Sequence, residues 1–254
     1  MILHDKVAII TGGASGLGRA VADALAAGGA RVSLFDRDSE RGVQAATELG
    51  SAAMFEQVDV TSESQVQAGI DATLARFGAI HICINCAGVP DAAKTVADGK
   101  PFPLALWDKV IAVNLTGTFN VLRLAAVAMA RNEPEGDERG VIINTASVAA
   151  FDGQTGQAAY SASKGGVVGM TLPMARDLGR YGIRVMTIAP GIFDTPMMQG
   201  VSEEYRQPLI AMVQNPKRFG APAEYGRLCV SIVENNYLNG ETIRIDGSIR
   251  MQAK

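Results

Sequence analysis

The stretch VAIITGGASGLGRA, residues 7–20, joins a short apolar run to a glycine-rich turn and then to a helical pattern. Gly12, Gly16 and Gly18 give the turn a GxxxGxG spacing. Glycines there allow a tight turn and let backbone N–H groups approach a pyrophosphate, which the dipole of the following helix attracts. The stretch therefore predicts a strand, a phosphate-binding turn and a helix at the start of a nucleotide-binding sheet.

Further short apolar runs follow the first, and amphipathic helical patterns separate them. Continuous apolar strands between such helices are typical of a parallel sheet that is covered on both faces. The sequence therefore predicts a doubly wound α/β fold, with a single domain over residues 1–254. The predicted strands are residues 7–11, 31–35, 52–58, 80–85, 140–147, 183–189 and 241–246.

Asp36 ends the second predicted strand. A carboxylate there can accept hydrogen bonds from the adenosine ribose hydroxyls and would repel a 2′-phosphate, which favours NAD over NADP. Arg37 leaves the choice open, because an arginine at that edge could accommodate a phosphate. Residues at the other strand ends should meet the adenine, the ribose and the pyrophosphate. The expected cofactor-binding residues so far are Gly12, Ser15, Gly16, Leu17, Gly18, Asp36, Asp59, Val60, Asn85, Cys86, Ala87 and Gly88.

Three irregular segments separate the regular patterns. Residues 89–106 and 191–222 follow predicted strands and contain Pro and Gly, so we expect both to be loops over the carboxyl edge that contact substrate. The second of them is the candidate lid. The polar stretch NEPEGDERG, residues 132–140, precedes a strand and is interpreted as a solvated turn at the opposite edge.

Composition narrows the functional classes. Of the 254 residues, 48% are hydrophobic and 19% charged, and the net charge of −3 leaves no large basic field for nucleic acid. The most apolar runs are interrupted by charges such as Arg123, so no membrane segment is expected. MILHDK leads directly into the first strand without room for a signal peptide, which favours a cytoplasmic protein.

The cysteines could suggest a metal site. Cys83 and Cys86 have CxxC spacing, and His81 stands nearby. Zinc needs about four ligands, however, and the remaining candidates are scattered. Residues 83 and 86 should also point to opposite faces of a strand end. We therefore expect no metal, and interpret the cysteines as small buried hydrophobes.

Tyr160 and Lys164 lie four positions apart in AAYSASKGG, residues 158–166. On a helix this spacing places both on one face. Taken alone, the spacing favours a surface tyrosine beside a solvated lysine over a catalytic pair.

Five motifs in order decide between these interpretations: TGGASGLG, NCAG, VNLTG, NTASVA and YSASK. With them the chain resembles the short-chain dehydrogenase/reductase family over its whole length. The resemblance implies a Rossmann fold with a seven-stranded parallel sheet in the order 3-2-1-4-5-6-7. It implies a catalytic set of Asn114, Ser147, Tyr160 and Lys164. It also places Tyr160, Lys164, Pro190, Gly191, Phe193 and Thr195 in the cofactor site, near the nicotinamide.

The catalytic set has a chemical rationale. A free tyrosine has a pKa of about 10, and a lysine ammonium about 5 Å away should lower it by about two units. Tyr160 is thus expected to be the general base in oxidation and the acid in reduction. Ser147 would hold the substrate oxygen, and Asn114 would position the water through which Lys164 reaches solvent.

Longer stretches resemble one subgroup, the type-2 3-hydroxyacyl-CoA dehydrogenases: residues 139–166, 169–196 and 238–252. The subgroup implies NAD-dependent oxidation of a (3S)-3-hydroxyacyl-CoA with a short or branched chain, and a homotetramer. Ser147, Gln157 and Tyr160 are the expected substrate contacts, and Gln154 is a further candidate. The alternatives are a dehydrogenase of hydroxysteroids or other secondary alcohols, a 3-oxoacyl thioester reductase, and a non-catalytic nucleotide-binding scaffold.

Overall fold

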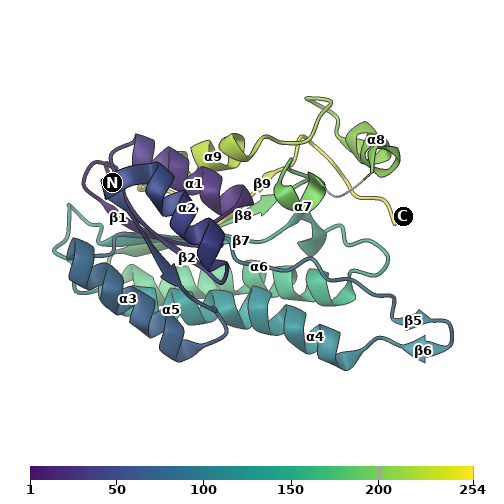
Figure 1. Cartoon of the computed structure of the whole chain (residues 1–254), viewed down its shortest axis with the longest axis horizontal. Helices are drawn as coiled ribbons and strands as arrows, with labels where there is room; N and C mark the ends of the chain where they lie inside the picture. The colour runs from purple at the N-terminus through teal and green to yellow at the C-terminus, as the bar shows by residue number, and fades with distance from the viewer. Residues whose placement is uncertain (200–201, 254) are drawn as a thin grey trace.

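The chain forms a parallel sheet between two layers of helices (Figure 1). The computed structural model describes residues 1–199 and 202–253. Over these residues the main sheet has seven strands in the order β3-β2-β1-β4-β7-β8-β9, which confirms the expected fold and strand order. The strands are β1 (Val7–Thr11), β2 (Arg31–Asp36), β3 (Ala53–Gln57), β4 (Ile82–Asn85), β7 (Gly140–Thr145), β8 (Ile183–Pro190) and β9 (Thr242–Ile245).

Two sets of helices cover the two faces of the sheet (Figure 1). On one face lie α1 (Gly16–Ala27), α2 (Ser39–Leu49) and α9 (Pro222–Glu234). On the other lie α3 (Glu63–Phe77), α5 (Thr118–Met129) and α6 (Ala158–Gly179). Short 3-10 turns, η1 (Gly50–Ala52) and η3 (Val148–Ala150), follow α2 and β7. Two helices, α7 (Pro196–Gln199) and α8 (Glu203–Met212), lie beyond the end of β8.

Side chains alternate between two cores, as the two-residue period of a strand requires. On β1, Ile10 is buried with the residues of α1 and α9, whereas Ile9 is buried with those of α3 and α5. The same alternation separates Ile143 from Ile142 on β7. Because both faces are covered, β1, β4, β7 and β8 are buried at every position.

A long helical run leads into the core. It comprises α4 (Leu104–Ile111), a π-helical segment η2 (Ala112–Gly117) and α5. By length and composition, Leu104–Met129 could cross a membrane, yet half of its most apolar window is buried inside the protein. A buried core helix of a soluble protein passes the same test. Its contacts with the sheet therefore account for its apolar composition.

Residues 89–106 follow the prediction only in part. Val89 and Pro90 line the cleft described below. Farther on, however, β5 (Val96–Ala97) and β6 (Lys100–Pro101) form an exposed hairpin that extends beyond α4 (Figure 1). The hairpin forms because Asp98 and Gly99 both have positive φ, which is the signature of a tight hairpin turn.

The turn at residues 132–140 is not solvated throughout, so that part of the prediction is wrong. Glu138 is buried, and its carboxylate binds the guanidinium of Arg184 on β8 at 2.7 Å. Arg184 also donates to the carbonyls of Ile232, Val233 and Leu238 beyond the sheet. The ion pair joins the turn before β7 to β8, and the hydrogen bonds of Arg184 extend this connection to the end of α9.

Candidate active site

A cleft of about 530 Å³ lies beyond the carboxyl ends of the strands, where ligands bind in doubly wound sheets. It gathers most of the residues that the motifs predicted. Among its lining residues are Gly12, Ser15, Gly16, Leu17, Gly18, Asp36, Asp59, Val60, Cys86, Ala87, Gly88, Ser147, Tyr160, Lys164, Pro190, Gly191, Phe193 and Thr195.

The glycine-rich turn fits a phosphate group. Gly12 and Gly16 have positive φ, and a Cβ on Gly18 would lie 2.2 Å from the carbonyl oxygen of Gly12. Within α1 the first turn is closed by the amide of Arg19, which donates to Ser15. The amides before it belong to the N-terminal turn, whose N–H groups have no carbonyl partner in a helix. Gly16, Leu17 and Gly18 therefore present donors to the cleft, as a pyrophosphate requires.

Asp36 lines the cleft beside the glycine-rich turn, where the sequence predicts the adenosine. Its carboxylate accepts from the amides of Ala14 and Asp38, which fixes it beside the glycine-rich turn. Arg37 is largely exposed, and its guanidinium lies 3.7 Å from the carboxylate of Asp59. Burial would raise the pKa of Asp59, but hydrogen bonds from Thr61 and the charge of Arg37 lower it overall. Arg37 thus already has an anionic neighbour at this edge.

Asn85 is a predicted cofactor-binding residue that is not among those lining the cleft, so its contact with a cofactor stays a prediction. Its side chain is buried in the sheet and donates to Asn144 at 2.9 Å, so it does not line the cleft. It ends β4, and the residues that follow it, Cys86, Ala87 and Gly88, line the cleft. Cys83 is packed in the core on the other face, which confirms that the two CxxC cysteines diverge. No group of three metal-binding side chains occurs in residues 1–199 and 202–253.

Tyr160 and Lys164 lie in the first turns of α6, on the face that meets the cleft. The Lys164 ammonium is 5.9 Å from the centre of the Tyr160 ring. It donates to the carbonyl oxygen of Thr145, at the end of β7, at 2.8 Å. Lys164 is only 5% exposed, so this carbonyl replaces the water that the ammonium loses.

The pKa values differ from the expectation. Burial raises the pKa of Tyr160, and a hydrogen bond from Ser147 offsets this in part. Burial also lowers the pKa of Lys164 from 10.5 to about 8. The charge of Lys164 therefore does not bring the pKa of Tyr160 below its ordinary value. A surface-like dielectric does not apply to this pair, because both groups are desolvated.

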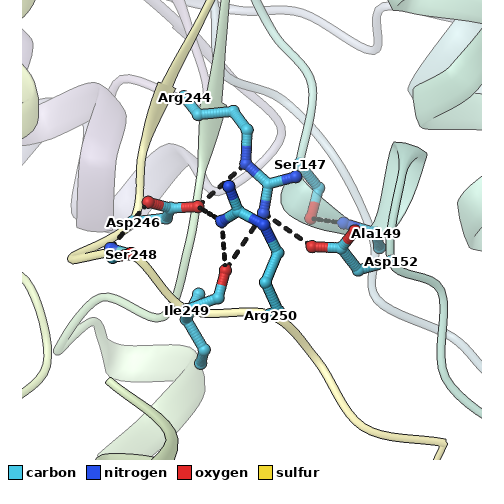
Figure 2. Close-up of polar contacts among 8 residues, drawn as sticks. All are labelled: Ser147, Ala149, Asp152, Arg244, Asp246, Ser248, Ile249 and Arg250. Carbon is cyan, nitrogen blue, oxygen red and sulfur yellow. Dashed lines mark hydrogen bonds and ion pairs between the residues drawn. The ribbon is translucent and has the colours of Figure 1, made fainter. Parts of the chain in front are cut away.

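Ser147 is the second residue after the end of β7 and caps the 3-10 turn η3, whose Ala149 amide donates to its Oγ at 3.1 Å. This cap holds the hydroxyl at the cleft beside Tyr160. Figure 2 shows Ser147 and Ala149 next to a cluster of charged side chains from β9 and the chain that follows it.

Asn114 is buried in the π-helical segment η2, and its side chain does not line the cleft. Its amide bonds both backbone groups of Val89 and donates to Ser163 on α6. A Cβ on Gly88 would lie 3.2 Å from Asn114 Oδ1 and 3.5 Å from Lys164 Nζ, so the three residues are neighbours. Asn114 ties the loop after β4 to α6, and its water-positioning role stays a prediction.

Gln154 and Gln157 both line the cleft. The oxygen of Gln157 accepts from the amide of Gln154 at 2.9 Å, and the Gln154 side chain donates to the carbonyl of Gln252 at 3.0 Å. Both glutamines therefore order the loop before α6. A contact of Gln157 with substrate stays a prediction.

The segment 191–222 begins as the prediction requires. Ile192, Phe193, Thr195, Met198 and Leu209 line the cleft. A Cβ on Gly16 would lie 3.7 Å from Thr195, so the segment faces the glycine-rich turn. Residues 200–201 and the side chain of Met197 lie outside the described part. Movement as a lid stays a prediction.

Sequence reasoning missed Thr145 and Tyr225. The hydroxyl of Thr145 bonds the buried Tyr225 hydroxyl at 2.7 Å and the sulfur of Cys86 at 3.4 Å. Thr145 thus connects α9 with the backbone that holds Lys164. The polar end of a buried strand was the available signal for Thr145, whereas Tyr225 lies inside an ordinary amphipathic helix.

The Rossmann-type sheet, the glycine-rich turn and the Tyr160–Lys164 pair define a dehydrogenase that acts on CH–OH groups. The sequence model of the short chain dehydrogenase family matches residues 6–206, and the chain belongs to this family.

The particular relatives share more than the family. The chain is 54% identical over 249 residues to the 3-hydroxyacyl-CoA dehydrogenase type-2 of Bos taurus, covering 97% of this chain and 95% of the relative. It is 53% identical over 253 residues to the protein of the same name from Drosophila melanogaster, covering 98% and 99%. A crystal structure of 3-hydroxyacyl-CoA dehydrogenase type-2 from Mycobacterium avium has 42% identity and a TM-score of 0.95, covering 98% of each chain.

Proposed function

We propose that the protein interconverts a (3S)-3-hydroxyacyl-CoA and its 3-oxoacyl-CoA, with NAD as the redox partner. The observation that carries the proposal is the convergence of Ser147, Tyr160 and Lys164 in one cleft with a glycine-rich turn and Asp36. Full-length relatives of that name support the substrate class.

Ser147 and Tyr160 have different roles in the reaction at the carbinol carbon. Ser147 donates to the substrate oxygen and orients the hydroxyl toward Tyr160. Tyr160, as phenolate, takes the hydroxyl proton while the C–H bond electrons leave as hydride. Bound NAD⁺ would accept that hydride at its nicotinamide ring. In the reverse direction the Tyr160 hydroxyl returns the proton to the carbonyl oxygen.

Lys164 assists electrostatically. Its ammonium is held by Thr145 beneath the tyrosine, so its charge stabilises the developing phenolate from one side. The raised pKa of Tyr160 means that the phenolate forms readily only when positive charge is added to the cleft. Oxidation releases a proton, so mildly alkaline pH should favour it until Lys164 loses its charge near its pKa of about 8.

The first test is NADH formation by the purified protein. (3S)-3-hydroxybutyryl-CoA and 2-methyl-3-hydroxybutyryl-CoA should be oxidised with higher kcat/KM than a hydroxysteroid, and with NAD rather than NADP. Turnover of the steroid with inert CoA esters would contradict the substrate class and leave the dehydrogenase assignment intact. Preference for NADPH in the reductive direction would instead support a thioester reductase.

The assembly proposed from the subgroup is a homotetramer. Phe119 and Val127 are exposed apolar residues on α5, eight positions apart and on one face of the helix. A hollow beside them is lined by apolar residues of α5 and α6, including Leu122, Ala126, Met174 and Leu178. A second copy of the chain would cover this surface.

A further inference from the structure

The chain that follows β9 returns across the loop that follows Ser147. Residues 246–253 lie against residues 148–157, and we call them the tail. The amide of Thr155 donates to the carbonyl of Ala253, and the Gln154 side chain donates to that of Gln252. The tail thus bonds the loop that precedes α6, next to the cleft.

Arg244, the third residue of β9, fixes the start of the tail (Figure 2). Its guanidinium binds Asp152 of the loop at 2.6 Å and Asp246 of the tail at 2.8 Å. It also donates to the carbonyl of Ile249 at 3.1 Å. Arg250 binds the same Asp246 at 3.1 Å. The cluster therefore has two cations and two anions, and its charges are balanced.

The ion pairs are partly shielded from water. The side chains of Arg244, Asp152 and Asp246 are 22%, 20% and 9% exposed. The Arg244 guanidinium also lies over the ring of Phe151, 5.3 Å from its centre. A planar arginine that is held by two carboxylates and stacked on a ring has little freedom to reorient. Arg244 therefore holds β9, the loop after Ser147 and the tail in fixed positions relative to one another.

Apolar contacts connect the tail to the wall of the cleft. Ile249 is fully buried against Val148 and Val213, and Met251 packs against the same cluster. Met251 also lines the cleft, together with Ser147, Gln154 and Ile192. Its side chain thus belongs to the wall of the substrate end, although it is the fourth residue from the end of the chain.

We propose that Met251 is a specificity-determining residue that limits the size of the group on the carbinol carbon, and that Arg244 positions it by joining the tail to the loop after Ser147. The inference rests on the proposed function only for the identity of that group, an acyl chain. A flexible thioether suits a wall that meets chains of different shape.

The test compares kcat/KM for (3S)-3-hydroxybutyryl-CoA with that for (3S)-3-hydroxyoctanoyl-CoA. Met251→Ala should raise the ratio of kcat/KM for the octanoyl ester to kcat/KM for the butyryl ester by about tenfold. Met251→Phe should lower the same ratio by a similar factor. Gln252→Ala is the matched control, because that neighbouring side chain is exposed. Its ratio should stay within about twofold of wild type.

Arg244→Gln and Asp152→Asn test the positioning. Each should shift the chain-length ratio in the direction of Met251→Ala and leave the Kd for NADH unchanged. The double variant Arg244→Gln/Met251→Ala should add little, since both changes remove the same wall. Equal loss of kcat for both substrates, or an unchanged ratio in the two Met251 variants, would overturn the proposal.

The design separates this inference from the proposed function. If wild type oxidises no CoA ester but oxidises another secondary alcohol, the proposed function fails. The Met251 variants are then compared on a short and a long homologue of that alcohol. A change in the ratio of kcat/KM for the long alcohol to that for the short one supports the proposed role of Met251. An unchanged ratio rejects that role.

Discussion

Lys164 is a buried cation whose described partner is a carbonyl oxygen rather than a carboxylate. Burial opposes the charge on Lys164 and also opposes ionisation of Tyr160. The sequence could place the two residues on one helical face, because a spacing of four is sufficient for that. It could not predict the sign of the shift at Tyr160, which depends on how much of the surrounding volume excludes water.

The lowered pKa of Lys164 predicts a pH dependence of stability. Its pKa of about 8 in the folded chain lies below the unfolded value, so folding is penalised while the ammonium must be buried. The penalty is full below pH 8 and is relieved between pH 8 and about 10.4. Relative to Lys164→Met, the wild type should gain on the order of 2 kcal/mol in free energy of unfolding from pH 7 to pH 10. Urea denaturation of both proteins measures it. Equal pH slopes would contradict the prediction.

Tyr160→Phe should remove the proton acceptor and leave the fold intact. We expect kcat to fall by about 10² to 10⁴, because general base catalysis is lost. The Kd for NADH, measured by its fluorescence, should change little. Tyr237→Phe, at an exposed tyrosine that does not line the cleft, is the matched control and should retain full activity. Comparable activity in the Tyr160→Phe and wild-type proteins would show that another group takes the proton.

Asp36→Ser should weaken discrimination between the two nicotinamide cofactors. The carboxylate that would repel a 2′-phosphate is lost, and the exposed Arg37 remains beside it. The ratio of kcat/KM for NAD to that for NADP should fall by about tenfold or more. Adding Arg37→Ala should restore part of the preference. An unchanged ratio in Asp36→Ser would mean that another residue selects the cofactor.

At the scale of elements, hydrophobic periodicity predicted the strands and the face of the sheet on which a side chain lies, because both depend on local sequence. The apolar runs gave the seven main strands, and the two-residue period correctly separated Cys83 from Cys86. Asn85 shows the limit of the motif argument. Its position at a strand end was correct, but its side chain meets Asn144 on the next strand, a neighbour that only the sheet creates.

Glu138 shows the same limit in a polar turn. NEPEGDERG has the composition of a solvated loop, and most of its residues are exposed. Glu138 is buried because Arg184 reaches it from β8, forty-six positions later in the chain. No pattern within the turn distinguishes this glutamate from its neighbours.

Glu138→Ala should therefore destabilise the fold strongly. It leaves the Arg184 guanidinium buried without its anion, a loss of about 3 to 5 kcal/mol for a buried pair. Asp137→Ala, at the exposed neighbouring position, should change stability by less than about 0.5 kcal/mol. Urea denaturation at neutral pH compares the two. Similar midpoints would show that carbonyls alone satisfy Arg184.

At the scale of the whole molecule, the parallel sheet brings distant motifs to one edge. Residues 12–18, 36, 59–60, 86–88, 145–147 and 190–195 meet there because each follows or ends a strand. This rule made most of the cleft predictable from sequence. Met251 is an exception to this rule. Contacts with a loop and with Arg244 place the tail, and not the end of a strand.

The proposed tetramer predicts an asymmetry between surfaces. Val127→Glu on α5 should reduce the mass measured by light scattering, because a charge would be buried in the contact between copies. Val43→Glu places the same charge at an equally exposed valine on α2, in the opposite helical layer, and should leave the mass unchanged. A monomeric wild type, or equal effects of the two variants, would contradict the proposed surface.

The order in which the two sides of the cleft follow one another along the chain has a consequence in time. The glycine-rich turn and Asp36 are synthesised before Arg244 and Met251, on which the far wall of the cleft depends. Because domains generally fold as units during synthesis, that wall cannot form until β9 and the tail have left the ribosome. The residues that select the substrate are therefore added to the nascent protein later than those that face the nucleotide.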